Sequence, residues 1–230
     1  MKKGVFVETS NVTRFRAAVA QARDFERGRP GMLMAWGEAG RGKTICAMNA
    51  FAEGGGVYLR AWEGWSQSAF LQALCFEITG LRPRGSNRSK VAIIQALDPE
   101  PRAIYIDEAD RLALGRLEDL RDIHDETGCP VVLIGEEGLA AKLSARRRID
   151  DRIPAEFRIR FEPVTCQDIS LYAMEAADLR LTPEASKFVH GLTRGNFRRV
   201  HNAMLSLEQM ARAAEVDIID QAMARRLGGK

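Results

Sequence analysis

Short apolar runs alternate with amphipathic stretches up to about residue 163 of the chain. Five of these runs predict buried strands, at residues 32–36, 57–60, 103–106, 131–134 and 157–161. Between them, apolar residues recur three and four positions apart, as from Phe70 to Ile78, which is the spacing of one buried helix face. Strands that alternate with helices indicate an α/β fold, with a mostly parallel sheet covered by helices on both faces.

Turn and cap residues delimit the helices of this region. Thr9, Ser10 or Asn11 can begin the first helix, Ser66 caps another, and Gly80 and Gly128 are typical helix stops. The polar segment 81–89 is expected to be a loop. The predicted helices lie at about 11–27, 45–51, 67–79, 90–97, 117–127 and 138–148.

The strand signals stop after Pro163, and only helical patterns follow. Helices are expected at about 167–179, 183–192, 196–214 and 218–226. We therefore expect two domains: an α/β nucleotide-binding domain of residues 1–163 and a small all-helical domain of residues 164–230.

A glycine-rich segment between the first strand and the next helix matches the P-loop pattern G-x-x-x-x-G-K-[ST] in full. It consists of Gly37, Glu38, Ala39, Gly40, Arg41, Gly42, Lys43 and Thr44. In such a loop the backbone N–H groups cradle phosphates at a helix N-terminus, the lysine reaches the β- and γ-phosphates, and the hydroxyl binds Mg²⁺. The sequence therefore predicts a site for ATP and Mg²⁺.

The third apolar run ends in two acids, Asp107 and Glu108, which is a Walker B pattern. Asp107 is expected to hold Mg²⁺, and Glu108 to orient or deprotonate the attacking water. The letters D-E-A-D at 107–110 also occur in a class of helicases. Such a helicase needs a second P-loop-like domain, and only the helical tail remains here.

Two arginine-rich segments follow the Walker motifs. One holds Arg146–Arg148 and Arg152, and the other is Gly195-Asn196-Phe197-Arg198-Arg199. Taken alone, each is typical of a solvated basic surface. With the two nucleotide motifs, this order resembles the AAA+ ATPases, which combine an α/β core with a helical lid. The resemblance implies an oligomer in which an arginine finger, Arg152 or alternatively Arg148, acts at a neighbour's site, while Arg198 serves as the sensor of the lid.

Glu136 departs from this pattern, because relatives carry Asn or a similar donor at or near this position. An ionised Glu accepts hydrogen bonds and cannot donate one to a phosphate or a water. We expect intrinsic hydrolysis to be slow for this reason.

Within the AAA+ ATPases, the sequences of four segments resemble those of the transposition ATPases of the phage Mu transposition protein B (MuB), TnsC and TniB type. These segments are residues 37–44, 106–112, 131–139 and 195–200. The resemblance implies ATP-dependent assembly, as a helical filament, on double-stranded DNA of any sequence. It also implies target capture for a DDE-type, MuA-like transposase that stimulates ATP hydrolysis. MuB carries a helix-turn-helix domain before its ATPase, and we expect this relative to lack it, because the first predicted helix begins near Asn11. We therefore expect DNA contacts from the core and the lid.

The segment 82–90 is the best candidate for those contacts. It holds four cations within nine positions, namely Arg82, Arg84, Arg88 and Lys90. Cations of this kind bind phosphates without reading sequence. The alternative is a mobile, solvated loop. Arg60 is a weaker candidate, and Trp62 and Trp65 can belong to the core or to a partner surface.

Net charge, hydrophobic pattern and cysteine content exclude few of the possible functions. The net charge of +3 does not require a nucleic-acid partner, and no apolar run approaches the ~20 residues of a membrane span. The four scattered cysteines indicate reduced thiols in a cytoplasmic protein. The resemblance to the transposition ATPases implies the cytoplasm of a bacterium or of a phage-infected bacterial host. Other interpretations remain: a helicase loader, a protein-directed ATPase similar to the ExeA-type secretion ATPases, a small-molecule P-loop kinase, or a nucleotide switch with almost no turnover.

Overall fold

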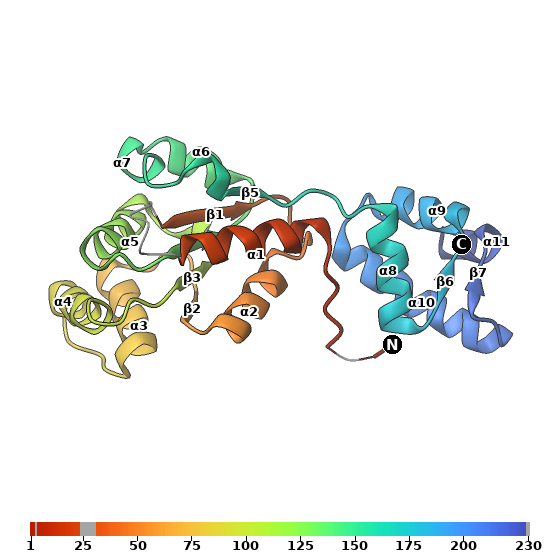
Figure 1. Cartoon of the computed structure of the whole chain (residues 1–230), viewed down its shortest axis with the longest axis horizontal. Helices are drawn as coiled ribbons and strands as arrows, with labels where there is room; N and C mark the ends of the chain where they lie inside the picture. The colour runs from red at the N-terminus through yellow and green to blue at the C-terminus, as the bar shows by residue number, and fades with distance from the viewer. Residues whose placement is uncertain (3, 24–30, 229–230) are drawn as a thin grey trace. The chain divides into compact units, whose positions relative to one another are not determined.

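A computed structural model describes residues 1–2, 4–23 and 31–228 of the chain. Its main element is a sheet of five parallel strands in the order β2-β3-β4-β1-β5 (Figure 1). The strands are β1 Met32–Trp36, β2 Val57–Arg60, β3 Ile104–Asp107, β4 Val131–Ile134 and β5 Arg158–Arg160. The prediction of a parallel α/β sheet is confirmed, and each strand lies within one or two residues of the expected range.

Burial on both faces explains why the sequences of the three inner strands show no alternation of apolar and polar residues. Every residue of β3 and β4 is buried, as are the first four of β1. β4 lies between β3 and β1, with Val132 paired to both Tyr105 and Leu33. A strand covered on both faces has no solvent side, so its positions are apolar, and Asp107 at the end of β3 is the buried exception.

Seven helices accompany this sheet in the described part of the chain. They are α1 Ser10–Ala22, α2 Lys43–Gly54, α3 Gln67–Thr79, α4 Ser86–Leu97, α5 Leu114–Thr127, α6 Gly138–Ser144 and α7 Arg147–Asp150, with short 3-10 turns η2 Ala109–Arg111 and η3 Ala155–Phe157. α2 packs on β2, β3 and β4, and α6 packs on β1. The predicted limits of α3 are confirmed, because the Ser66 hydroxyl accepts from the Ala69 N–H at 3.2 Å and Gly80 ends the helix at φ 74°.

Two expectations about these helices were wrong. α4 begins at Ser86, so the last residues of the predicted loop are helical. Gly85, at φ 92°, starts the helix, and the Ser89 hydroxyl donates to the Gly85 carbonyl at 3.0 Å. The single helix expected at 138–148 is two helices, because Arg146 is extended. The predicted end of the first helix, at 24–27, falls outside the described residues.

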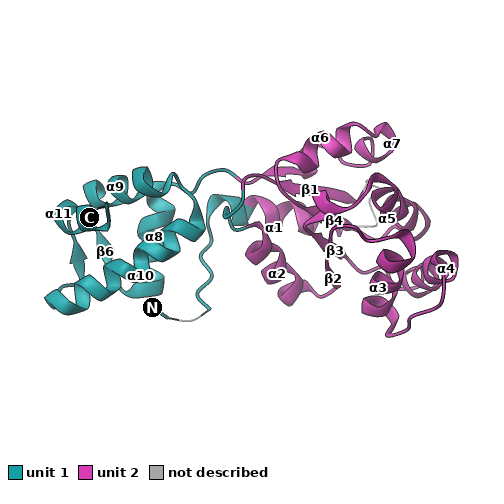
Figure 2. Cartoon of the chain, turned by 180° about the vertical axis from the view of Figure 1, so that it is seen from behind, with its two compact units in different colours: residues 1–13, 39–42, 162–230 teal, residues 14–38, 43–161 magenta. Residues whose placement is uncertain are grey.

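The described chain divides into two compact units (Figure 2). The sheet unit contains residues 14–38 and 43–161, and the helical unit contains residues 1–13, 39–42 and 162–230. The phosphate loop is shared, because its tip, residues 39–42, groups with the helical unit. The expected domains of residues 1–163 and 164–230 stay a prediction.

The helical unit forms its own core around Ile169, Val189 and Met204, which are fully buried. Its helices are α8 Cys166–Ala177, α9 Pro183–Thr193, α10 Phe197–Ala214 and α11 Gln221–Arg225, followed by the 3-10 turn η4 Arg226–Gly228. Its strands β6 Arg180–Leu181 and β7 Ile218–Ile219 pair in parallel. The expectation of helices alone was wrong here, because two-residue strands are too short to show a periodicity. No helix in the described residues is long and apolar enough to cross a membrane.

Candidate nucleotide-binding site

The phosphate loop has a backbone that only glycine adopts easily. Gly37, Gly40 and Gly42 have φ values of 141°, 80° and 93°, in the region that L side chains rarely occupy. A Cβ on Gly37 would also lie 2.7 Å from the Phe161 carbonyl oxygen. The loop runs from β1 into α2, which starts at Lys43, so the N–H groups of a helix N-terminus are available to an anion.

The Lys43 side chain is buried and folded against this loop. Its Nζ donates to the Gly37 carbonyl at 2.6 Å and to the Glu38 carbonyl at 2.9 Å. Burial lowers the pKa of the Lys43 ammonium, and the carboxylates of Glu136 and Asp107 oppose this shift. The Lys43 ammonium thus lies against the phosphate loop, whose backbone N–H groups a phosphate would bind.

Thr44 and Asp107 come together as the two motifs predict. The Thr44 hydroxyl lies 3.1 Å from Asp107 Oδ2, and Asp107 is only 2% exposed. A hydroxyl beside a carboxylate is a donor set that suits Mg²⁺, which prefers oxygen ligands and retains several waters. These residues therefore fit the metal that accompanies ATP.

Tyr58 is part of this site, although no motif indicated it. Its hydroxyl donates to Asp107 Oδ2 at 3.0 Å. Burial, and next the charge of Asp107, raise the pKa of the Tyr58 phenol, which stays protonated as a donor. The available signal was the alternation of β2, where Tyr58 and Arg60 share one face beside the end of β3.

Glu108 has an unusual backbone and a paired carboxylate. Its φ of 56° and ψ of 35° place it in the left-handed region at the start of η2, which is uncommon for a residue with a side chain. Its carboxylate pairs with Arg60 and with Arg111, each at 3.1 Å. Arg60, the weaker DNA candidate, therefore lies against the predicted catalytic carboxylate.

Glu136 follows β4 in a loop that Asp110 fixes. The Glu136 N–H donates to Asp110 Oδ1 at 3.0 Å, and a Cβ on Gly135 would clash with the same oxygen. Of the charges that raise the pKa of Lys43, Glu136 contributes most. Its carboxylate thus acts on the position where the phosphates of ATP are expected.

Replacing Glu136 by Asn is expected to raise the basal ATP turnover several-fold, since it removes a like charge from phosphate and supplies a donor. ATP affinity should rise as well. Steady-state hydrolysis and calorimetric titration of ATP, with the exposed Glu137→Gln variant as control, measure both. Unchanged turnover and affinity would show that Glu136 has no influence on the nucleotide.

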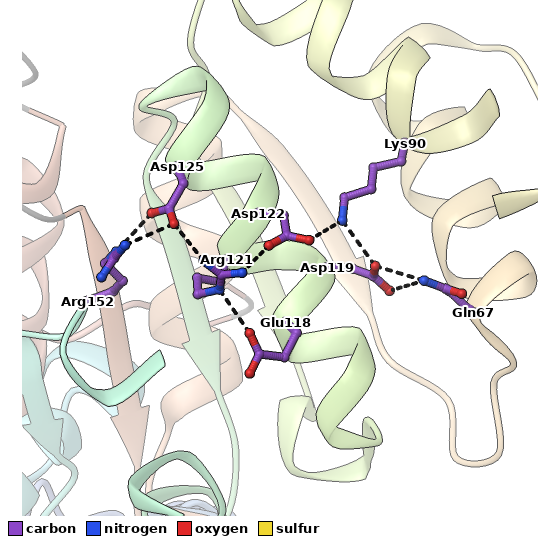
Figure 3. A network of polar contacts seen from close by, with 8 residues as sticks. All are labelled: Gln67, Lys90, Glu118, Asp119, Arg121, Asp122, Asp125 and Arg152. Atoms are coloured by element: carbon purple, nitrogen blue, oxygen red, sulfur yellow. Dashed lines mark hydrogen bonds and ion pairs between the residues drawn. The ribbon is translucent and has the colours of Figure 1, made fainter. Parts of the chain in front are cut away.

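The first finger candidate, Arg152, belongs to a network of ion pairs (Figure 3). Its Nε and Nη2 donate to the two oxygens of Asp125 at 2.9 and 3.1 Å. Lys90, a DNA candidate, points into the same network and pairs with Asp119, at 3.3 Å, and with Asp122. Both cations are engaged within the sheet unit, and their proposed roles stay predictions.

Arg148, the second finger candidate, is exposed and has no hydrogen bond or ion pair with any residue that the structure describes. It lines an open depression of about 430 Å³ together with Arg146, Arg147, Ala145 and Glu118. An unpaired guanidinium can reach a phosphate on another molecule without first breaking an internal pair. This difference favours Arg148 over Arg152.

Arg198 lies in the first turn of α10, in the helical unit. Its backbone N–H donates to the Gly40 carbonyl at 3.3 Å, within the same unit, and its side chain is exposed. The sensor role of its guanidinium stays a prediction.

Three of the four DNA candidates are exposed. Arg82 stacks over the Phe76 ring, with its guanidinium carbon 4.4 Å from the ring centroid. Arg84 precedes α4, Arg88 lies in its first turn, and neither has a described ion pair. These three cations face solvent, whereas Lys90 does not.

The two tryptophans differ in their surroundings. Trp62 is 66% exposed and stacks on Trp65, with ring centroids 5.8 Å apart at 23°. Trp65 in turn contacts the buried ring of Phe70. Trp65 thus continues the core, and Trp62 presents an indole ring at the surface.

Comparison with known proteins agrees with this site. Residues 26–143 match the family model described as AAA domain, which includes both Walker motifs. A curated relative from Staphylococcus aureus, described as a potential ATP-binding protein, is 31% identical over 117 residues. The match covers 46% of this chain and 42% of that protein, so the chain spans less than half of its length.

Solved structures share the fold at low identity. The RuvB Holliday junction branch migration motor of Thermotoga maritima gives a TM-score of 0.58 at 17% identity, covering 96% of this chain and 68% of that chain. Aeropyrum pernix Orc1, solved with DNA, gives 0.64 at 17%, with 96% and 65% covered. Domain III of the Thermotoga maritima replication initiation protein DnaA gives 0.59 at 19%, with 97% and 92% covered. Family match, fold and site agree: the chain belongs to the AAA domain family, the P-loop ATPases of the AAA+ type.

Proposed function

We propose that this protein is an ATPase that assembles with ATP on double-stranded DNA of any sequence, as a filament that captures target DNA for a DDE-type, MuA-like transposase. The single observation that carries the DNA part is the set of three exposed arginines at 82, 84 and 88 on an ATPase core. The proposed role in transposition rests on the resemblance of the motif sequences to those of the MuB, TnsC and TniB type.

In the proposed reaction, the phosphate loop and Lys43 bind the phosphates of ATP. Mg²⁺, held through Thr44 and Asp107, supplies charge neutralisation to the phosphates when bound. Tyr58 keeps the Asp107 carboxylate in place through its hydroxyl hydrogen bond. Glu108 orients the attacking water and accepts its proton. Arg60 and Arg111 hold the Glu108 carboxylate before the reaction.

The DNA contacts are assigned to Arg82, Arg84 and Arg88. Arginines that bind phosphates give affinity without sequence preference and release counterions on binding. Two structural neighbours are linked to nucleic acids, since RuvB is described as a Holliday junction branch migration motor and Orc1 was solved in a complex with DNA. These neighbours support a nucleic-acid partner for the present chain.

The test combines the salt dependence of DNA binding with electron microscopy. With a slowly hydrolysed ATP analogue and duplex DNA, we expect filaments that are absent with ADP or without DNA. Changing Arg82, Arg84 and Arg88 together to Ala should weaken binding to all sequences. It should also reduce the slope of log affinity against log salt by about one unit for each lost contact.

A matched control is the Arg180→Ala variant, which removes one exposed cation in the helical unit. A triple variant with the slope and affinity of this control would exclude the segment 82–88 as the DNA contact. Isolated particles that never associate with DNA would exclude the DNA-binding function altogether.

Trp62 favours a second candidate function, an ATP switch that acts on a protein, as in a helicase loader or an ExeA-like ATPase. Exposed tryptophans are enriched at the energetic centres of protein interfaces. The same electron microscopy separates the two functions, because a protein-directed switch would oligomerise with ATP alone and ignore DNA.

A further inference from the structure

The tip of the phosphate loop makes its described contacts within the helical unit. Residues 39–42 group with that unit, and the contacts converge on the turn 194–198 between α9 and α10. This turn is itself constrained, because Arg194 and Gly195 have φ values of 53° and 62°. The P-loop pattern explains Lys43 and Thr44, but it does not explain these contacts.

Asn196 uses both ends of its side-chain amide. Its Nδ2 donates to the Ala39 carbonyl at 2.8 Å, while its Oδ1 accepts from the Arg199 N–H at 3.2 Å and caps α10. The amide also packs directly on Gly40, where a Cβ would lie 2.5 Å from Oδ1. Asn196 therefore connects the loop tip to the start of a helix.

Arg41 makes the reciprocal contact from the loop. Its Nη1 donates to the Arg194 carbonyl at 3.0 Å and to the Gly195 carbonyl at 2.7 Å. Arg41 is only 8% exposed. A buried guanidinium that donates to two carbonyls fixes the separation of the two segments.

These contacts determine how the peptide groups of the loop are oriented. In a trans peptide, the carbonyl of one residue and the N–H of the next point in opposite directions. Asn196 holds the Ala39 carbonyl, so the Gly40 N–H points away from the turn. The Arg198 N–H holds the Gly40 carbonyl at 3.3 Å, so the Arg41 N–H points away as well. N–H groups are what a P-loop offers to phosphate.

We propose that Asn196 and Arg41 are positioning residues: their side chains join the tip of the phosphate loop to the turn 194–198 and so direct the N–H groups of the loop toward the phosphates. This inference rests on the proposed binding of ATP. Nucleotide affinity then depends on this turn, through side chains that bond the loop and the turn to each other and do not contact the nucleotide.

The test is the Asn196→Ser variant, compared with Asn202→Ser on the same helix. Serine keeps an acceptor for capping α10 but is too short to donate to the Ala39 carbonyl. Asn202 is exposed and lies beyond the turn. We expect calorimetric Kd values for ATP and ADP to rise about tenfold in Asn196→Ser, which is the value of one lost hydrogen bond. The melting temperature should lie only about 2–4 °C below that of Asn202→Ser, because the lost hydrogen bond is also present without nucleotide.

Arg41 gives a second variant pair. Arg41→Met should weaken ATP at least as much as Asn196→Ser, and Arg41→Lys, which retains a donor, should recover part of the loss. A purely structural role would lower the melting temperature and leave the Kd of the folded protein unchanged. Kd values within twofold of the wild type in both Asn196→Ser and Arg41→Met would overturn the inference while leaving ATP binding intact. A wild-type protein that binds no ATP would overturn the proposed function with it.

Discussion

Replacing Glu108 by Gln is expected to lower ATP turnover by roughly 10²–10⁴-fold, the usual contribution of a positioned general base. Gln keeps the size of the side chain but cannot accept the proton of the attacking water. Gln can keep the left-handed backbone that Glu108 has at φ 56°, directly after Asp107. A loss of this size should therefore come from the chemical step and not from misfolding.

Two measurements separate those causes. The Kd for ATP should stay within a few-fold of the wild type, because the phosphate loop and the Thr44–Asp107 pair are untouched. The exposed Glu126 on α5 has no described partner, so Glu126→Gln is the matched control and should retain full turnover. If Glu108→Gln retained more than about a third of the wild-type turnover, another group would have to be the base.

The sequence predicted those features of the fold and the site that depend on residues close together in the chain. Runs such as Val131–Ile134 predict inner strands because a strand covered on both faces is apolar on both of its sides. The P-loop predicts its site because three glycine positions need positive φ and the chain order puts a strand before them and a helix after them. The pairing of Thr44 with Asp107 follows because both motifs lie at the carboxyl ends of parallel strands of one sheet, β1 and β3, and these ends share one edge.

The parts that could not be predicted depend on contacts between distant segments. Tyr58 is an ordinary strand residue until β2 pairs with β3 and brings its hydroxyl to Asp107. The sequence does not show that Arg152 and Lys90 form ion pairs, because their carboxylate partners lie on α5 and reach them only through packing. The start of α4 was missed because its first turn, Ser86–Ser89, is polar and shows no periodicity.

Arg148 and Arg152 lead to opposite expectations for the finger. Because Arg148 is unpaired among the described residues and Arg152 is held by Asp125, we expect Arg148→Ala to lower the stimulated turnover by about 10³-fold or more, the value of an arginine finger. Arg152→Ala should instead lower it only several-fold and reduce the melting temperature, since it removes a bidentate ion pair. Arg147→Ala, at a neighbouring exposed position, is the control and should be nearly neutral.

A mixing experiment tests whether the finger acts on another subunit. Glu108→Gln and Arg148→Ala are each expected to be inactive alone. In an equal mixture, about a quarter of head-to-tail interfaces would combine an intact Glu108 with an intact Arg148 from the neighbour. Turnover should then recover toward roughly a quarter of the wild-type value. If the mixture were as inactive as its components, Arg148 would either act on the site of its own subunit or not be the finger. Recovery in a mixture of Glu108→Gln with Arg152→Ala would assign the finger to Arg152.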